Sequence, residues 1–208
     1  MKKKLRLEVA SDVVCPWCYI GKRRLEKALE LLKDDLDVEV RWLPFQLNPG
    51  LPPEGIPRAD YRKAKFGSLE RSKQMDARVA TEGRGEGIEF AFDRMETQPN
   101  TVQAHRLIAV AENQNAVVDA LFQAHFEQGR NIGDPKVLAE IAAQCGVKGW
   151  PEQAPDVSAA EEEVRGMGIS AVPTFIFERR SGVSGAYPAE TLAQAIREAV
   201  SPAKAGAK

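Results

Sequence analysis

The stretch Ser11-Asp12-Val13-Val14-Cys15-Pro16-Trp17-Cys18-Tyr19 places two cysteines three positions apart, after an alternating segment and before a helical one. At a helix start, unpaired backbone N–H groups and the positive end of the helix dipole stabilise an anion, so we expect a lowered pKa for the Cys15 thiol. Cys18, one turn later, would lie close enough to attack a mixed disulfide on Cys15. The segment therefore predicts a redox pair in which Cys15 is the nucleophile and Cys18 the resolving thiol.

The alternative for a Cys-x-x-Cys pair is one half of a zinc site, which needs two further ligands, commonly from a second close pair. The sequence has no second pair: the remaining candidates, His105, His125 and Cys145, are scattered through a helical region. A pair between a strand and a helix favours redox chemistry over metal binding. We therefore expect no metal and no dissociable cofactor.

A β-α-β unit surrounds the cysteine pair. Residues 4–10 and 38–42 alternate charged and apolar side chains with period two, so both ranges predict strands. Residues 19–32 carry apolar side chains at helical spacing, among them Leu25 and Leu32. Two strands joined through one helix are expected to be parallel, with a right-handed crossover.

A helical block follows from residue 51 to about residue 166, where apolar side chains recur with period 3.6. Residues 52–55, Pro-Pro-Glu-Gly, mark its start. Within the block, Asp134 followed by Pro135 predicts a helix start, and Gly146 predicts a helix end. We expect four or five packed helices here.

The strand pattern returns after Gly168. Residues 174–177 predict a strand, 179–182 a turn, 183–187 a second strand and 189–200 a closing helix. This order predicts an α/β protein with a thioredoxin-like fold and an all-helical insertion. The expected domains are a thioredoxin-like domain and a helical insertion domain, formed by residues 1–50 with 167–208 and by residues 51–166.

Composition excludes several classes of partner and location. The 208 residues include 29 Lys and Arg against 30 Asp and Glu, so the net charge of −1 gives no reason to expect a nucleic acid or an anionic membrane as partner. No apolar run approaches the ~20 residues needed to span a bilayer. The basic start Met1-Lys2-Lys3-Lys4 leads into an alternating segment rather than a signal-peptide core, and three cysteines do not describe a secreted disulfide framework. We expect a cytoplasmic protein.

Five segments of the sequence resemble the DsbA-like branch of thioredoxin-fold oxidoreductases, specifically its FrnE-type members. They extend over nearly the whole chain and comprise residues 11–23 (SDVVCPWCYIGKR), 44–49 (PFQLNP), 104–107 (AHRL), 168–175 (GISAVPTF) and 184–186 (SGA).

The resemblance implies a thioredoxin fold with a helical insertion, a redox-active Cys15/Cys18 pair and a cis peptide before Pro173 that faces this pair. Some relatives carry serine at the nucleophile position and catalyse glutathione-dependent transfer or isomerisation, so Cys15 favours redox chemistry here. Some FrnE-type proteins have a further cysteine pair near the C-terminus. This chain has no such pair, so any function of that second pair is not carried over to it.

The Val172-Pro173 step can also be interpreted physically. A proline at the start of a strand has no N–H for the ladder, and a cis X-Pro bond costs only about 0.5–1 kcal/mol. A cis bond would leave the Val172 backbone open to pairing with an extended substrate segment. The alternative, a trans proline at a strand edge, is less favoured beside Cys15.

Other candidate site residues surround the pair. Trp17, between the cysteines, is expected to contact substrate, and Phe45 and Asn48 to line a groove unless they belong to an ordinary proline-rich turn. His105 falls one position off its apolar stripe, which predicts a place on the flank of its helix and a weak role in substrate binding. Asp12 is expected to cap the helix after Cys15, with proton transfer from Cys18 as the alternative. His125 and Cys145 lie on apolar faces and predict core positions.

The sequence therefore predicts a cytoplasmic thiol-disulfide oxidoreductase, a reductase or isomerase acting on protein or small-thiol disulfides through Cys15 and Cys18, with glutathione as a candidate partner. Two alternatives stay open. One is a glutathione-dependent transferase or isomerase on the same fold, and the other is a non-enzymatic peptide-binding chaperone.

Overall fold

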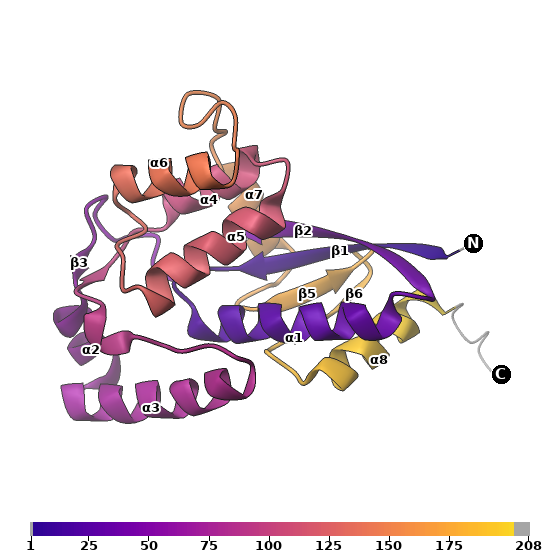
Figure 1. Cartoon of the computed structure of the whole chain (residues 1–208), viewed down its shortest axis with the longest axis horizontal. Coiled ribbons are helices and arrows are strands. Elements are labelled where there is room, and N and C mark those ends of the chain that lie inside the picture. The colour runs from indigo at the N-terminus through magenta and orange to yellow at the C-terminus, as the bar shows by residue number, and fades with distance from the viewer. Residues whose placement is uncertain (1, 202–208) are drawn as a thin grey trace.

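A four-stranded mixed sheet organises the protein, of which the computed structural model describes residues 2–201 (Figure 1). The strand order is β2-β1-β5-β6. β1 (Lys3–Ser11) pairs in parallel with β2 (Leu36–Pro44), as predicted, and antiparallel with β5 (Thr174–Phe177). β6 (Ser181–Ser184) pairs antiparallel with β5 at the edge. The last residues of the predicted thioredoxin-like domain, 202–208, lie outside the described part of the chain.

The main core lies on the face of the sheet covered by two helices. α1 (Pro16–Leu32) and α8 (Ala189–Val200) run beside each other under the sheet in Figure 1. Their buried side chains, including Leu25 and Ile196, pack with Leu7 of β1 in one hydrophobic cluster. α1 starts three residues before the predicted start because Pro16 occupies its first turn, where no backbone N–H is needed.

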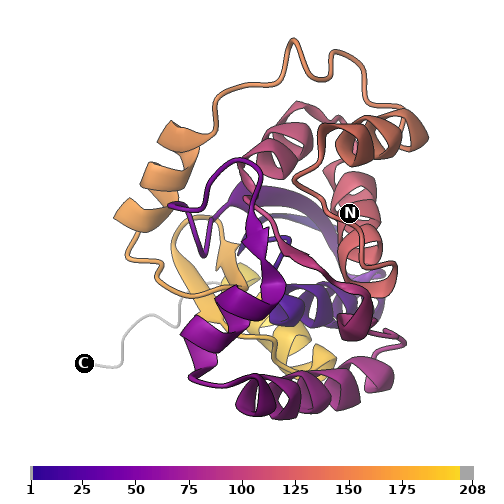
Figure 2. The same ribbon diagram turned by 90° about the vertical axis from the view of Figure 1, so that its left-hand side faces the viewer.

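The other face of the sheet has a smaller apolar cluster and a buried ion pair. Val164 of α7 (Ser158–Gly166) packs against Ala10 and Phe45, so α7 covers this face opposite α1 (Figure 2). Farther along β1, the buried Glu8 pairs with Arg179, with 2.8 Å between Arg179 Nε and Glu8 Oε2. The buried carboxylate is therefore charge-paired.

The segment between β2 and β5 is largely helical, as predicted, but contains more elements than expected. It has six α-helices rather than four or five, together with a 3-10 turn (Phe92–Arg94), a π-helical turn (Gln123–Glu127) and the two-residue strands β3 and β4. Besides α7, these helices and strands are β3 (Ile56–Pro57), α2 (Arg58–Phe66), α3 (Leu69–Gly85), β4 (Thr97–Gln98), α4 (Val102–Val110), α5 (Gln114–Phe122) and α6 (Pro135–Gln144). Two-residue strands are too short to produce a period in the sequence.

The helical segment and the sheet share one core. Leu107 of α4 and Phe122 of α5 belong to the same cluster of buried side chains as Leu7 and Val9 of β1. Cys18 belongs to it as well. The helical segment therefore packs directly behind the cysteine pair, and the division of the chain into two domains stays a prediction.

Local signals in the sequence account for several element ends. The Asp134 side chain accepts a hydrogen bond from Lys136 N at 2.8 Å and Pro135 follows at the first helical position, which confirms the predicted start of α6. Gly146, with φ of +65°, confirms its predicted end. The second C-terminal strand, β6, runs from Ser181 to Ser184 rather than over the predicted 183–187, because left-handed residues Glu178 and Arg179 reverse the chain early.

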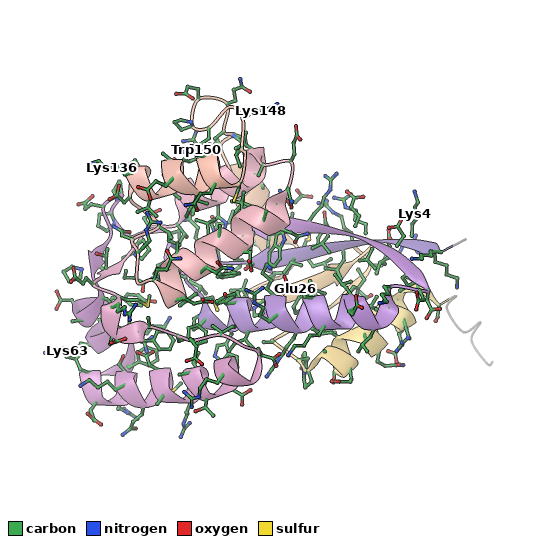
Figure 3. All side chains as sticks on the ribbon, viewed as in Figure 1. Lys4, Glu26, Lys63, Lys136, Lys148 and Trp150 are labelled. Carbon is green, nitrogen blue, oxygen red and sulfur yellow. The ribbon has the colours of Figure 1, made fainter. Side chains whose placement is uncertain are left out.

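Charged side chains lie mainly at the surface. Figure 3 shows the labelled Lys4, Lys63, Lys136 and Lys148 extending outward at widely separated points. None of the helices within residues 2–201 combines the length and apolar character needed to cross a bilayer.

Gly21 joins α1 to the loop before β5. A methyl group on Gly21 would lie 2.9 Å from Pro173 Cγ and 3.4 Å from Phe175 Cζ, closer than side chains normally approach. Alanine would gain about 1 kcal/mol of helix propensity but meet a rigid ring, and overpacking costs roughly 1–3 kcal/mol. We expect Gly21→Ala to lower the free energy of unfolding in urea by about 1–2 kcal/mol.

Gly85→Ala is the matched control, since Gly85 ends α3 and no atom lies within 4 Å of its added methyl group. Its free energy of unfolding should equal the wild-type value or rise by up to about 1 kcal/mol, because alanine gains helix propensity there without a clash. A Gly21→Ala protein as stable as the wild type would contradict the close packing of α1 against Pro173.

Candidate functional site

Cys15 occupies the junction between the loop after β1 and the start of α1. Its backbone is extended, with φ of −94° and ψ of 112°, and its N–H donates to Asp12 O at 3.0 Å. Its own carbonyl accepts from Cys18 N at 3.0 Å and Tyr19 N at 3.3 Å, which closes the first turn. Cys15 is thus the residue immediately before the helix, as the sequence predicts.

The surroundings of Cys15 favour its thiolate. A hydrogen bond from the Cys18 thiol is the largest effect and lowers the pKa of Cys15. Burial and the Asp12 charge act in the opposite direction, whereas the backbone N–H groups of Cys18 and Trp17 at the helix start lower the pKa further. The net result is a lowered pKa, as predicted, although the Cys18 thiol contributes more than the backbone groups.

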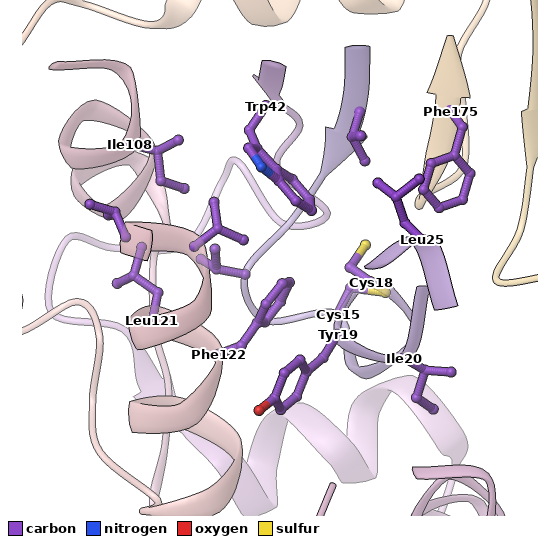
Figure 4. Close-up of a cluster of buried hydrophobic side chains, with 14 of the residues drawn as sticks. Cys15, Cys18, Tyr19, Ile20, Leu25, Trp42, Ile108, Leu121, Phe122 and Phe175 are labelled. Carbon is purple, nitrogen blue, oxygen red and sulfur yellow. The ribbon is translucent and has the colours of Figure 1, made fainter. Parts of the chain in front are cut away.

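Cys18 has the opposite character. Burial raises the pKa of Cys18 well above its usual range, and the hydrogen bond to Cys15 and the charge of its thiolate raise it further. Cys18 is 1% exposed and Cys15 6% exposed. Figure 4 shows the two sulfur atoms close together among Tyr19, Leu25 and Trp42. The pair therefore has one sulfur suited to attack and one that stays protonated in the core.

The loop before β5 faces the cysteines. The Val172–Pro173 peptide is cis, which confirms the predicted geometry. The Val172 carbonyl oxygen lies 3.8 Å from Cys15 Sγ, although the two residues are 157 positions apart. Gly185 N donates to Pro173 O at 2.8 Å and holds the loop against the chain after β6.

The other predicted substrate-binding residues divide between the surface and the core. Trp17 is 39% exposed beside the cysteines, and Asn48 is half-buried and accepts a hydrogen bond from Tyr61 Oη at 3.2 Å. The Phe45 ring is buried beneath the Arg165 guanidinium, 4.3 Å from its carbon to the ring centre. Phe45 thus supports its loop from below and does not face solvent.

Asp12 does not have the capping role expected from the sequence. The helix start has no side-chain cap, and Asp12 Oδ2 instead accepts a hydrogen bond from Leu47 N at 2.7 Å. Asp12 is fully buried, so this bond joins the loop before the cysteines to the loop after β2. The prediction is wrong because the side chain turns toward a neighbouring strand end rather than along α1.

His105 is also placed differently from the prediction. It is 4% exposed, not on the flank of α4, because β2, α5 and the cysteine loop cover this side of the helix. Its Nε2 atom lies 3.4 Å from Asp12 Oδ1, but the two atoms form no hydrogen bond and neither has another hydrogen-bond partner. A single helix pattern cannot reveal which neighbours pack against its edge.

Ser11 was assigned no role from the sequence, yet it lies beside this group. The alternation of β1 that places Leu7 and Val9 in the main core also places Ser11 on that side, and Ser11 is 4% exposed. Burial raises the pKa of Cys18 and the Ser11 hydroxyl acts in the opposite direction, although Ser11 Oγ has no hydrogen-bond partner of regular geometry. The alternation of buried and outward positions along this strand, counted from Val9, is the sequence signal that places Ser11 on the core face.

The structure confirms the predicted core position of His125, whereas Cys145 lies at the edge of the core. His125 is buried, and its Nδ1 donates to the Arg130 carbonyl at 3.3 Å. Burial lowers the pKa of His125 to about 4, so its ring is neutral at physiological pH. Cys145 is only half-buried because it follows the last residue of α6, where the helix face that packs on the core ends. Within residues 2–201, no three His, Cys, Asp or Glu side chains cluster in a way that could hold a metal ion.

Comparison with known proteins places this arrangement in a family. The sequence matches the DsbA-like thioredoxin domain over residues 6–197. Uncharacterized protein YwbO of Bacillus subtilis (strain 168) is 30% identical over 186 residues, covering 83% of this chain and 86% of that protein.

Solved structures have the same architecture. Probable DsbA oxidoreductase SCO1869 from Streptomyces coelicolor is 32% identical with a TM-score of 0.84, covering 96% of this chain and 93% of that one. Cytosolic disulfide reductase DsbM from Pseudomonas aeruginosa, solved with GSH, is 21% identical with a TM-score of 0.59, covering 94% and 95%. These similarities confirm the predicted thioredoxin-like fold with a helical insertion. The chain belongs to the family of DsbA-like thioredoxin domains.

Proposed function

We propose that this protein is a thiol-disulfide oxidoreductase that reduces or isomerises disulfides of proteins or small thiols. The observation that carries the proposal is the asymmetry of the pair: the pKa of Cys15, the less buried of the two, is lowered, while the pKa of the fully buried Cys18 is raised. Thiol-disulfide exchange requires a thiolate to attack first and a second thiol to act later. Two equivalent cysteines would lack that order.

The reaction follows from these roles. The Cys15 thiolate attacks one sulfur of a substrate disulfide and releases the other as a thiolate, which takes up a proton. Cys18 then loses its proton and attacks Cys15, so a Cys15–Cys18 disulfide forms and the second substrate sulfur leaves. The substrate disulfide is reduced by two electrons and the cysteine pair is oxidised by two. An external thiol such as glutathione can reverse the change in the protein.

The surface around Cys15 is suited to an extended or flexible substrate. Trp17 offers an exposed ring beside the nucleophile, and the Val172–Pro173 loop lies against Cys15 Sγ. We propose that Trp17, Asn48, Val172 and Pro173 contact substrate directly. Phe45 and His105, which are buried, act on the site from beneath.

The motifs support a finer assignment within the family. We place the protein among the FrnE-type members, on the segments around Cys15, Phe45, His105 and Pro173. We also propose a cytoplasmic location, where net reduction or isomerisation is sustained by the thiol pool, and glutathione as the small-thiol partner. The GSH in the DsbM structure supports this choice of partner.

Replacing Cys18 by Ser tests the assignment of roles. Attack by Cys15 should continue while resolution stops, so the Cys18→Ser protein should accumulate as a mixed disulfide with a disulfide-bonded peptide substrate. The adduct is measured by mass spectrometry under non-reducing conditions. Cys15→Ser should show no adduct and no turnover.

The control for this experiment is Cys145→Ser, because Cys145 directly follows α6, is not part of the pair and should leave turnover unchanged. Adducts on Cys18 in the Cys15→Ser protein would reverse the assigned roles. Isomerisation or conjugation of a small electrophile with glutathione that survives Cys18→Ser would instead favour the glutathione-dependent alternative.

The pKa of Cys15 should depend on the hydrogen-bond donor at position 18. Because the Cys18 thiol is the largest influence lowering that pKa, Cys18→Ala should raise it more than Cys18→Ser, whose hydroxyl can still donate. Cys15 becomes a thiolate as the pH rises through its pKa, so its alkylation rate should increase there. In both variants, the pKa of Cys15 is measured from the thiolate absorbance and from the rate of alkylation by iodoacetamide, each as a function of pH.

We expect the Cys18→Ser value to stay below the unperturbed thiol pKa of about 8.5. Equal Cys15 pKa values in the two variants would show that a hydrogen bond from residue 18 is not what lowers this pKa. A Cys15 that titrates above the unperturbed value in both would contradict its role as nucleophile.

A further inference from the structure

The charge of this chain is distributed unevenly. Residues 58–85, which form α2, α3 and the turn between them, contain eight Lys and Arg against four Asp and Glu, a net charge of +4. The whole chain has 29 and 30 of these residues, so the remaining 21 Lys and Arg and 26 Asp and Glu give the rest a net charge of −5. We call residues 58–85 the basic hairpin, because it is a cationic part of an otherwise acidic protein.

Pairs within the protein use half of the acids of the basic hairpin. Asp76 pairs with both Arg62 and Arg58, with 2.8 Å between Asp76 Oδ2 and Arg58 Nη2. Glu82 pairs with Arg24 of α1 at 2.8 Å. The two remaining acids and six cations are exposed and form no ion pair within residues 2–201: Asp60 and Glu70, and Lys63, Lys65, Arg71, Lys73, Arg78 and Arg84. The surface of the hairpin therefore has an excess of free positive charge.

The stability of the fold does not account for this excess. α2 has no buried residue, so hydrophobic burial contributes little to holding it in place. The helix dipole favours Lys63 and Lys65 in the last turn of α2, but it opposes Arg71 in the first turn of α3. Cations on both sides of a two-residue turn also repel one another. Their clustering costs folding free energy, which points to a role in binding.

The basic hairpin is joined to the loop after β2, which lies at the same sheet edge as the cysteines. Asn48 of this loop accepts a hydrogen bond from Tyr61 Oη at 3.2 Å, and Tyr61 Oη accepts one from Lys65 Nζ at 2.9 Å. Lys65 Nζ also lies 5.3 Å from the centre of the Tyr61 ring. Figure 1 shows α2 at the end of the molecule where α1 begins. The Lys65 ammonium is thus fixed at the rim of the proposed substrate site.

The loops around Cys15 supply no positive charge of their own. Residues 12–17, 45–51 and 167–173 contain no Lys or Arg, and their one acid, Asp12, is fully buried. Arg165 donates to the loop after β2 but is already paired with Glu161 at 2.6 Å. A charged substrate that reaches Cys15 therefore meets the free cations of the basic hairpin beside an almost uncharged site.

We propose that the basic hairpin docks an acidic polypeptide segment next to the substrate disulfide. This inference rests on the proposed function and names its substrate class, which is proteins whose cystines lie beside Asp or Glu residues. The free cations extend over two helices, of which α2 alone is about 14 Å long. A chain with several carboxylates can pair with several of these cations at once, whereas a glutathione moiety offers few.

Three peptides that differ only in the residues flanking one internal disulfide test the proposal. The flanking residues are Glu, Gln or Lys, and the second-order rate of peptide reduction by the reduced protein is measured by acid quench and chromatography. A one-signed surface beside a site raises association rates by roughly 10- to 1,000-fold, so we expect the Glu peptide to react about tenfold faster than the Lys peptide at about 0.1 M salt. At about 1 M salt, where the Debye length is only about 3 Å, this ratio should fall to within about twofold.

Charge reversal distinguishes docking from damage to the fold. Lys63→Glu/Lys73→Glu changes two exposed lysines without ion-pair partners, so the rate with the Glu peptide should fall about tenfold while the rate with the Lys peptide rises. A damaged fold would slow both. Lys65→Gln keeps a hydrogen-bond donor for Tyr61 but removes the charge at the rim, and should slow the Glu peptide about threefold.

The matched control is Lys2→Glu/Lys3→Glu, which changes the net charge equally at the opposite end of β1 from the cysteine loop. Its rates with all three peptides should stay within about twofold of the wild-type rates. A ratio of Glu-peptide to Lys-peptide rates that the hairpin variant leaves unchanged, or that the control shifts equally, would overturn the proposal. Slower reduction of glutathione disulfide with no change for the Glu peptide would show that the hairpin serves a small thiol instead.

The proposed function can fail separately. A wild-type protein that reduces none of the three peptides would overturn the proposed function. Docking is then measured without turnover, from the fluorescence anisotropy of a labelled Glu peptide that has serine in place of its cysteines. Tighter binding to the wild type than to Lys63→Glu/Lys73→Glu would support the basic hairpin as a docking surface, and equal binding would overturn it.

Discussion

Ala10 of β1 pairs with Thr174 of β5, and this antiparallel register decides what can face Cys15. β1 ends at Ser11 and leads into the cysteine loop, while β5 begins just after Pro173. The pairing therefore brings the two loops to the same edge of the sheet. On the other side of β1, the parallel pairing of Ser11 with Pro44 places the loop after β2 at that edge as well. Three connections, distant in sequence, form the site because one central strand pairs on both sides.

The fold could be predicted where the periodicity of the sequence is long and regular. β1, α1, β5 and α8 are found within a few residues of their expected positions. The roles of Asp12 and His105 could not be predicted in this way, because each depends on which element packs against it. Asp12 bonds to Leu47 from the loop after β2, and His105 is covered by β2 and α5. Neither contact leaves a pattern within its own segment.

The helical insertion takes part in the site as well as in the core. Leu107 and Phe122 pack in the same cluster as Cys18, and His105 from the same helix as Leu107 faces Asp12. On the other side of the sheet, Glu161 and Arg165 of α7 hold the loop after β2: Glu161 accepts from Gln46 N at 2.9 Å, and Arg165 donates to Gln46 O at 2.7 Å. Changes in the insertion can therefore reach the cysteines without any residue contacting substrate.

The near-complete burial of Cys18 has a consequence for the oxidised protein. When the pair forms a disulfide, an incoming thiolate must approach along the line of the bond, and the less buried of its two ends is the Cys15 sulfur. Attack at the other sulfur would require a partner to enter the hydrophobic cluster. Each encounter is therefore regioselective: a covalent adduct can form only at the position where the neighbouring thiol can release it. The core thus disfavours the formation of a dead-end adduct on Cys18.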